Sequence, residues 1–318
     1  MLYQLLKLYA RFAIKIYCRK IVINKPDYLH KKGPLLLACN HPNSFLDGII
    51  LTTLFDEDVY SLARGDAFKK IDRLLRKLRL LPVYRTSEGV ENLEHNYTTF
   101  DSCHELFKQN GVVIIFSEGG CVNEWHLRPL KKGTARLATS AWQKGIDVAV
   151  LPVGLNYSTF RNFGKNVFIN FGEPLNKEAI LQHQTDGKLF LSFNEKLEQQ
   201  LKQLVFEIEP SDKQTLHQKL YIHQATGKKV VVLGPFAVIG FIVYALFYFL
   251  IKLIAYLVFD NDHFDSVVAS LSLLLYPIYF LLLLFFANHF LGLFGLLISM
   301  FFLPFCAWAI VQLKNQLD

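Results

Sequence analysis

Long apolar runs with almost no charge fill the C-terminal part of the chain, and they restrict its fold more than any other feature. Residues 230–251 include no charged side chain over 22 positions. A helix crosses the hydrocarbon core of a bilayer with about 20 apolar residues. Two further runs of similar length follow at about 267–287 and 290–311. We therefore expect residues 228–318 to form a membrane anchor with two or three hydrophobic spans.

The flanks of these runs indicate an orientation. Lys228 and Lys229 precede the first run, and an acidic loop at Asp260–Asp265 follows it. Because lysines beside a span favour the cytosolic side, we expect the first span to begin in the cytosol and the acidic loop to lie outside. Only Asn288 and His289 separate the later runs, which favours either a tight helical hairpin or one irregular re-entrant pair. A buried soluble core is the alternative, and three long, nearly uncharged runs argue against it.

The charge balance divides the chain at the same place. Residues 230–318 hold two basic and four acidic side chains, so the net charge of +7 becomes +9 on residues 1–229. A basic region of this kind suits an anionic lipid surface or an anionic substrate. The five cysteines form no C-x-x-C pair, which argues for a reducing compartment. The ten histidines show no metal-binding spacing, so we expect no metal.

The first residues have the pattern of an amphipathic helix. Lys7, Arg11 and Lys15 recur at every fourth position of residues 2–20, and apolar side chains occupy the remaining faces. A basic stripe on an apolar helix fits a helix that lies at a membrane interface. A helix packed on its own domain fits the pattern equally well. We assign residues 1–30 to an N-terminal membrane-docking helix.

Residues 31–227 form the central domain, in which short apolar runs alternate with helical segments. This alternation predicts an α/β fold, with a mixed sheet flanked by helices. Residues 176–227 are polar and helical in pattern. The expected strands are 35–39, 59–62, 112–116, 148–153 and 167–171, and the expected helices are about 44–54, 66–79, 92–109 and 134–144.

The first candidate for chemistry is a histidine directly after a predicted buried strand. His41 follows the strand at 35–39, and ligand sites of α/β proteins lie at this edge of the sheet. A neutral imidazole is a suitable general base, and the carboxylate of Asp47 is placed to fix its tautomer. Because the chain lacks a G-x-S-x-G nucleophile motif, the base would activate an external hydroxyl for direct attack on a thioester. The Ser44-x-x-Asp47 spacing equally fits a helix capping box, which would give Asp47 a structural role.

A second candidate lies after the predicted strand at 112–116. Glu118, Gly119 and Gly120 form an acid followed by two glycines, which favours a tight turn at the same sheet edge. Glu118 would orient an acceptor hydroxyl or the backbone of the loop. An ordinary exposed turn carboxylate is the alternative.

Basic residues supply the third set of candidates. Arg85 follows a strand-like run at 80–84, and it is placed to bind a phosphate. Arg128 and Lys131 precede Gly133 and the start of a helix, an arrangement suited to anions. No nucleic-acid recognition motif accompanies these charges, so we expect no nucleic-acid partner.

Taken in order, these segments resemble the glycerolipid acyltransferase family, which includes glycerol-3-phosphate and lysophosphatidic acid acyltransferases. The resemblance covers about residues 34–176. Four blocks carry it, followed by a closing Gly-x-Pro-Leu turn. These are His41 with Asp47, then Pro82-Val83-Tyr84-Arg85, Phe116-Ser117-Glu118-Gly119-Gly120-Cys121 and Val150-Leu151-Pro152-Val153-Gly154, and finally Phe171-Gly172-Glu173-Pro174-Leu175.

The chain departs from the family pattern at two positions. Five residues separate His41 from Asp47, where the family has four. Cys121 stands where the family has an arginine, so Arg85, Arg128 or Lys131 would have to replace that phosphate contact. Both departures resemble the branch that acylates glycerol-3-phosphate or dihydroxyacetone phosphate.

The resemblance implies an O-acyltransferase of phospholipid synthesis. It would move an acyl group from acyl-CoA or acyl carrier protein to a hydroxyl of glycerol-3-phosphate or lysophosphatidic acid, without a cofactor. We expect an integral membrane protein that contacts membrane lipids, with its catalytic domain on the cytosolic face. The alternatives are an aminolipid acceptor and a catalytically silent lipid-binding scaffold. The implied catalytic residues are His41 and Asp47, and the implied substrate-binding residues are Arg85, Glu118, Gly119, Gly120, Arg128 and Lys131.

Overall fold

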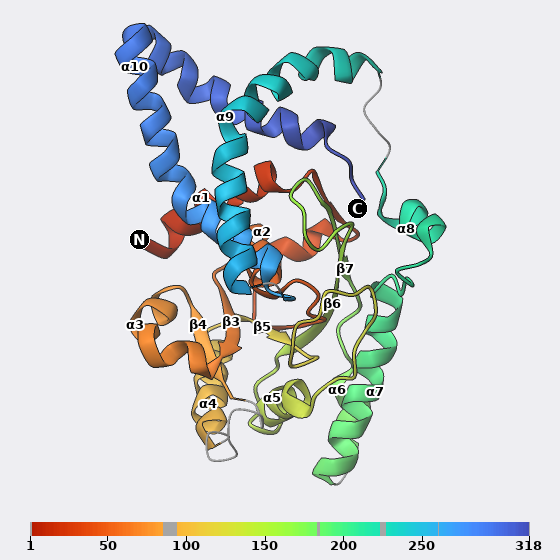
Figure 1. Ribbon diagram of the computed structural model, residues 1–318. Helices are drawn as coiled ribbons and strands as arrows, with labels where there is room; N and C mark the ends of the chain where they lie inside the picture. Colours follow the sequence, from red (N-terminus) through yellow and green to blue (C-terminus); the bar gives the residue numbers. More distant parts are fainter. Residues whose placement is uncertain (1, 85–93, 183–184, 223–226, 260, 318) are drawn as a thin grey trace.

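A mixed seven-stranded sheet lies at the centre of the computed structural model, which describes residues 2–84, 94–182, 185–222, 227–259 and 261–317 (Figure 1). The spatial order of the strands is β1-β7-β6-β2-β5-β3-β4. Neighbouring strands are parallel except for β6 and β7, which are antiparallel. The strands are β1 Lys20–Ile23, β2 Leu35–Cys39, β3 Val59–Arg64, β4 Leu80–Val83, β5 Val112–Phe116, β6 Ala149–Tyr157 and β7 Asn166–Phe171.

All five expected strands are present, and β4 corresponds to the strand-like run before Arg85. Strand β1 differs from expectation, because it falls inside the N-terminal segment that we assigned to a helix. It pairs with β7 in parallel, with Lys20 opposite Asn166, so the sheet begins before residue 31. Its four residues, Lys-Ile-Val-Ile, are too few to show a strand period beside a helical pattern.

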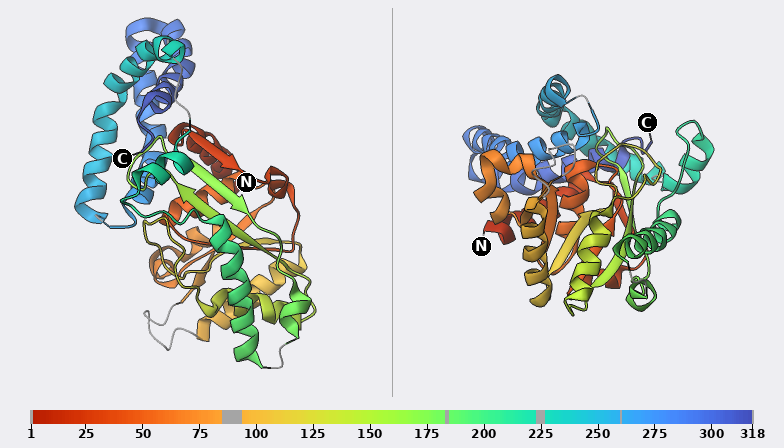
Figure 2. Two further views of the ribbon diagram at one scale, coloured as in Figure 1. Left: turned by 90° about the vertical axis from the view of Figure 1, so that its right-hand side faces the viewer. Right: turned by 90° about the horizontal axis from the view of Figure 1, so that it is seen from below.

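Helices cover both faces of the sheet, as the alternating pattern predicted. Helices α1 (Leu2–Tyr17) and α2 (Ser44–Leu54) pack on one face through Ile14, Ile50 and Leu51. The other face buries side chains of the remaining sheet-covering helices. These are α4 His95–Lys108, α5 Lys132–Gln143, the short α6 Lys177–Leu181 and α7 Asp186–Leu204. The view along the sheet in Figure 2 shows this layered arrangement. Two other helices, α3 (Phe68–Lys77) and α8 (Lys213–Leu220), lie outside these layers.

Two of the three basic residues of the α1 stripe, Lys7 and Arg11, contact the domain, and Lys15 is exposed. Lys7 is buried, and its ammonium donates to the backbone carbonyls of Asp56 (3.2 Å) and Glu57 (2.6 Å). Arg11 donates to the carbonyl of Thr53 at 2.7 Å. These carbonyls lie at the C-terminal end of α2, where a helix presents unpaired acceptors and negative potential. The exposed residues of α1 are mostly apolar, namely Leu2, Leu5, Leu8 and Phe12, together with Gln4 and Lys15.

Two long apolar helices complete the chain, α9 (Gly227–Phe259) and α10 (Phe264–Leu313). Within the described residues, both are long and apolar enough to cross a membrane. The helical geometry of α10 breaks at Gly292, where φ is 67°, three residues beyond the expected break at Asn288-His289. Figures 1 and 2 show α9 arched and α10 folded back on itself, so that both stand off one end of the α/β domain.

Ring contacts show how these two helices pair. Phe236 of α9 meets Phe302 and Phe305, which follow the break in α10. Tyr244 of α9 meets Tyr276, which precedes that break. Each half of α9 therefore packs against a different half of α10.

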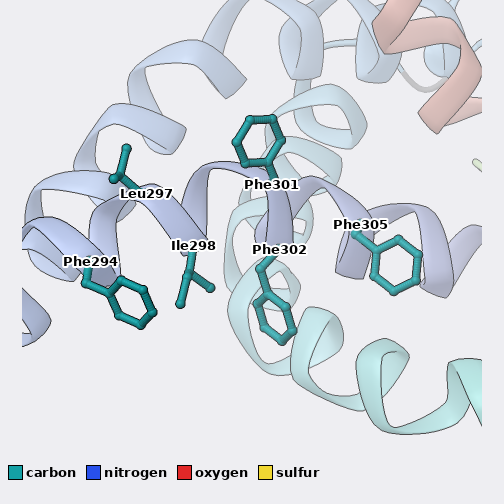
Figure 3. Close-up of a pocket in the computed structure, with 6 residues that line it drawn as sticks. All are labelled: Phe294, Leu297, Ile298, Phe301, Phe302 and Phe305. Atoms are coloured by element: carbon teal, nitrogen blue, oxygen red, sulfur yellow. The ribbon is translucent and has the colours of Figure 1, made fainter.

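A shallow apolar hollow of about 640 Å³ lies on the last part of α10 (Figure 3). Only apolar side chains of this helix line it, and none of them belongs to a candidate site. They are Phe294, Leu297, Ile298, Phe301, Phe302 and Phe305.

The expected orientation of this tail is wrong, because the acidic loop lies against the α/β domain. The side chain of Asp265 accepts hydrogen bonds from Tyr17 of α1 (2.8 Å) and from Asn43 (2.9 Å). The far end of α10 also returns to the domain, where Arg19 donates to the carbonyl of Gln312 at 2.8 Å. Lys229, at the start of α9, donates to the Gln312 side chain at 3.0 Å. Because of these contacts, the loop cannot lie across a bilayer from the domain. The charges that flank the apolar runs gave no signal for these contacts.

Candidate active site

Two adjacent parallel strands bring the first and third sequence blocks together. Strands β2 and β5 pair with Cys39 opposite Phe116, and the N–H of Ser117 donates to the carbonyl of Cys39 at 2.8 Å. The residues that follow, His41 and Glu118, therefore lie side by side at the carboxyl edge of the sheet. The N–H of His41 donates to Oε2 of Glu118 at 3.1 Å.

His41 and Asp47 form the expected pair. Nδ1 of His41 lies 2.9 Å from Oδ2 of Asp47, whose side chain is fully buried in the first turn of α2. The imidazole stacks on Phe116 with ring centroids 3.8 Å apart and an interplanar angle of 13°. A carboxylate on Nδ1 favours the tautomer with the proton there and leaves the lone pair on Nε2. The His41 side chain is 14% exposed, so a substrate can reach the ring.

Asp47 also has a structural role beside its contact with His41. Oδ2 accepts the backbone N–H of Asn43 at 2.9 Å, so one oxygen serves both the loop and the imidazole. Oδ1 accepts the hydroxyl of Tyr157 at 2.6 Å. Burial raises the pKa of Tyr157 well above its usual range, so this hydroxyl stays protonated and donates. Asp47 therefore contacts both the imidazole and the loop backbone, but the N–H that it accepts belongs to Asn43 and not to Ser44, as the predicted capping box requires.

Tyr157 was not among the residues that the sequence analysis selected. It ends β6, three residues after the fourth block, and shares a strand face with Val153 and Leu155. Counting alternate residues along β6 from that block would have placed Tyr157 on the face of the sheet where α2 packs.

The longer spacing between His41 and Asp47 is accommodated at the first residue of α2, Ser44. Ser44 has φ of 45°, a left-handed conformation that side chains other than glycine seldom adopt. Its N–H donates to the sulfur of Cys121 at 3.0 Å. Cys121, which stands in the place of the family arginine, therefore contacts the longer loop.

Glu118 is buried, and its carboxylate accepts hydrogen bonds from two backbone N–H groups. Its Oε2 accepts from His41, and its Oε1 accepts the N–H of Arg128 at 3.1 Å, which corresponds to the loop-orienting role expected for it. Burial raises the pKa of Glu118 to about 7, and the two backbone bonds oppose this shift. Gly119, with φ of 67°, needs its lack of a side chain, because a Cβ would lie 2.8 Å from Cγ of Lys131.

The remaining expected residues surround this turn. The N–H of Lys131 donates to the carbonyl of Ser117 at 2.8 Å, and its side chain is exposed. The guanidinium of Arg128 lies 3.5 Å from Glu124 and is partly exposed. Gly120 is partly buried beside Gly119. Arg85 lies outside the described residues.

The sequence analysis also missed a contribution from the tail. Asp262 accepts the N–H of Asn123 at 3.1 Å, and His263 Nδ1 lies 2.6 Å from the hydroxyl of Ser44. These contacts span more than 130 positions of sequence, and local patterns give no signal for them. Among the residues that the structure describes, no group of three or more His, Cys, Asp or Glu side chains could hold a metal ion.

The arrangement defines a class of site. A partly exposed imidazole, held by a buried carboxylate at the carboxyl edge of an α/β sheet, is equipped to remove a proton from a substrate hydroxyl. A neighbouring glycine turn and partly exposed cations offer contacts for an anionic group.

Comparison with known proteins agrees with this class. The family described as Acyltransferase matches residues 20–156, so this part of the chain is similar to that family. The match includes His41, Asp47, Glu118 and the strands that position them.

Two curated relatives come from Saccharomyces cerevisiae. Glycerol-3-phosphate O-acyltransferase 2 is 33% identical over 94 residues, which are 29% of this chain, and Glycerol-3-phosphate O-acyltransferase 1 is 31% identical over 87 residues, or 25%. Each match spans 12% of the length of the yeast protein. The crystal structure of the 1-acyl-sn-glycerophosphate (LPA) acyltransferase PlsC from Thermotoga maritima aligns with a TM-score of 0.47 at 17% identity. That alignment covers 65% of this chain and 80% of PlsC, and its score is too low to support an argument.

Proposed function

We propose that the protein transfers a fatty acyl group from an acyl thioester to a hydroxyl of glycerol-3-phosphate or lysophosphatidic acid. The observation that carries the proposal is the contact of 2.9 Å between His41 Nδ1 and the buried carboxylate of Asp47. The similarity of residues 20–156 to the acyltransferase family supports the reaction type. The similarity to the two yeast glycerol-3-phosphate O-acyltransferases supports a glycerol phosphate acceptor.

The reaction begins at Nε2 of His41. This nitrogen takes the proton of the acceptor hydroxyl, and the oxygen forms a bond to the thioester carbonyl carbon. The carbon–sulfur bond then breaks, and the departing thiolate takes the proton from the imidazolium. The products are an ester and a free thiol, and His41 returns to its neutral form. Asp47 holds the tautomer and stabilises the imidazolium during the step.

Cationic groups beside the glycine turn support an acceptor that carries phosphate. Lys131 and Arg128 have partly or fully exposed side chains close to Glu118 and Gly119. We propose that they bind the phosphate together with Arg85, in place of the arginine that Cys121 replaces. The backbone of Glu118, Gly119 and Gly120 shapes the edge of this pocket.

The apolar surfaces support attachment to a bilayer. In the most apolar 18-residue stretches of α9 and α10, only 17% and 11% of the residues are buried. The exposed residues of α1 are also mostly apolar. We propose an integral membrane protein in which α9 and α10 enter the bilayer, α1 lies at its surface, and the catalytic domain is on the cytosolic face with the acyl donor.

A thiol-release assay on the membrane-embedded protein tests the reaction. With acyl-CoA and glycerol-3-phosphate or lysophosphatidic acid, we expect His41→Ala to lower turnover by at least about 1,000-fold, because the general base is removed. His30→Ala is the matched control, since His30 Nδ1 also contacts a carboxylate, that of Asp56 at 2.6 Å, on the exposed surface. The control should retain full activity. Substantial turnover by a folded His41→Ala protein contradicts the mechanism.

A further inference from the structure

The polar start of α10 contacts the segment between His41 and Asp47, which is one residue longer than in the family pattern. Ser266 is fully buried, and its hydroxyl donates to the carbonyl of Asn43 at 2.6 Å. The same hydroxyl accepts the N–H of Leu46 at 3.0 Å. His263 Nδ1 lies 2.6 Å from the hydroxyl of Ser44, between these two contacts. Residues 263–266 of the tail therefore contact three of the residues between His41 and Asp47, which are Asn43, Ser44 and Leu46.

Ser266 supplies a contact that the N-terminus of a helix needs. The first N–H groups of a helix have no partner inside that helix, and the residue before it usually caps them with its own side chain. Asn43 precedes α2, but its side-chain amide donates to Asp265 at 2.9 Å instead. The N–H of Leu46 is shared between the hydroxyl of Ser266 at 3.0 Å and the carbonyl of Asn43 at 3.1 Å, and the N–H of Ser44 donates to Cys121. Segments distant in sequence thus cap α2.

A buried ion pair fixes the segment that supplies this cap. Lys165 donates to Asp265, and both side chains are completely buried. Tyr17 donates to the other oxygen of Asp265 at 2.8 Å. Because an uncompensated buried charge is strongly unfavourable, Asp265 cannot leave Lys165 without a large penalty. The start of α10 is therefore held against α1 and the strand β7.

Positive φ at Ser44 explains why such support is needed. A left-handed non-glycine residue is a strained conformation, which persists only when its surroundings impose it. The strain lies between His41 and Asp47, whose contact depends on the path of this loop. Contacts at Asn43, Ser44 and Leu46 hold that path in place.

We infer that the start of α10, His263–Ser266, positions the His41–Asp47 pair and is part of the catalytic apparatus. This inference rests on the proposed function. Ser266 is its central positioning residue and acts through Asp47 without touching the substrate. The apolar tail therefore has a second role beside attachment to the bilayer.

Kinetics of the full-length protein test the inference. Ser266→Ala should lower kcat about 5- to 20-fold with KM for acyl-CoA within about twofold, since one or two hydrogen bonds to the loop are lost. Ser266→Thr keeps the hydroxyl and should recover most of the activity. Ser270→Ala, one turn further along α10, is the matched control and should be normal.

A double variant separates positioning from a general loss of structure. If Ser266 acts through the pair, Ser266→Ala combined with Asp47→Asn should be no slower than Asp47→Asn alone, because the interaction that it supports is already gone. His263→Ala gives the same comparison should Ser266→Ala not fold. Normal kcat in Ser266→Ala, or decreases that multiply in the double variant, overturns the inference. An active His41→Ala protein would instead overturn the proposed function.

Discussion

The start of helix α10 buries polar side chains, whereas its middle exposes aromatic side chains. At the start, Asp265 and Ser266 are completely buried. In the middle, Phe294 and Phe301 are 75% and 77% exposed. In water, a helix with its polar groups inside and its aromatic groups outside would be unstable. The start of α10 is therefore part of the core of the α/β domain, whereas its middle exposes the side chains that a lipid-facing helix would expose, as we propose for α10.

The same contrast separates α10 from the strands that carry the site. Every residue of β2 is buried, and its side chains fill the two cores of the domain. Helix α10 places most of its large apolar side chains outside. Hydropathy alone therefore does not distinguish a buried strand from a lipid-facing helix, and length and exposure must decide.

The largest effect on stability is expected at the buried start of α10. Asp265→Ala leaves Lys165 charged and unpaired inside the protein, which should lower the free energy of unfolding by about 3–5 kcal/mol. Asn288→Ala, on the exposed part of the same helix, is the matched control and should be nearly neutral. Thermal and chemical unfolding in detergent micelles measure both.

Removing both charges sharpens this test. Lys165→Met together with Asp265→Leu should recover part of the lost stability, because well-packed apolar side chains can replace a buried ion pair. Equal stability of Asp265→Ala and Asn288→Ala would show that the start of α10 is not buried in the domain.

A smaller effect is expected at the exposed middle. Phe301→Lys should oppose insertion into a bilayer by roughly 2.5–3.5 kcal/mol if the residue lies near the centre of the membrane. In water, the same exposed substitution would change stability by less than about 0.5 kcal/mol. Leu191→Lys on α7, at an exposed leucine of the catalytic domain, is the matched control. The fraction of protein retained by membranes after alkaline washing measures the difference, and equal retention of both variants contradicts a lipid-facing α10.

Local patterns were sufficient for every strand of the sheet except β1, and for placing His41 and Glu118 at the same edge of the sheet. Each expected strand was a short apolar run bounded by turn residues, and burial on both faces makes such runs continuous. His41 and Glu118 met because their strands are neighbours, and both directly follow these runs. The contact between His41 and Asp47 also depends on the left-handed conformation of Ser44, which no sequence periodicity predicts.

Contacts distant in sequence escaped the analysis. Lys7 and Arg11 formed a visible stripe, but a helical pattern does not say whether its basic face meets lipid or the carbonyls of α2. The acidic loop was assigned to the far side of the membrane by its charge. Its partners, Asn43, Ser44 and Asn123, lie in segments that become neighbours only in the folded protein.

The position of the acidic loop tests the central claim most directly. In sealed vesicles of one orientation, a membrane-impermeant maleimide is applied to the full-length protein with Asn261→Cys in the loop. Lys188→Cys, at the start of α7, marks the catalytic domain, and mass spectrometry identifies each labelled peptide beside the native cysteines. Both positions are exposed. We predict that the reagent labels both from the same side of the membrane. Labelling of Asn261→Cys and Lys188→Cys from opposite sides would contradict the account.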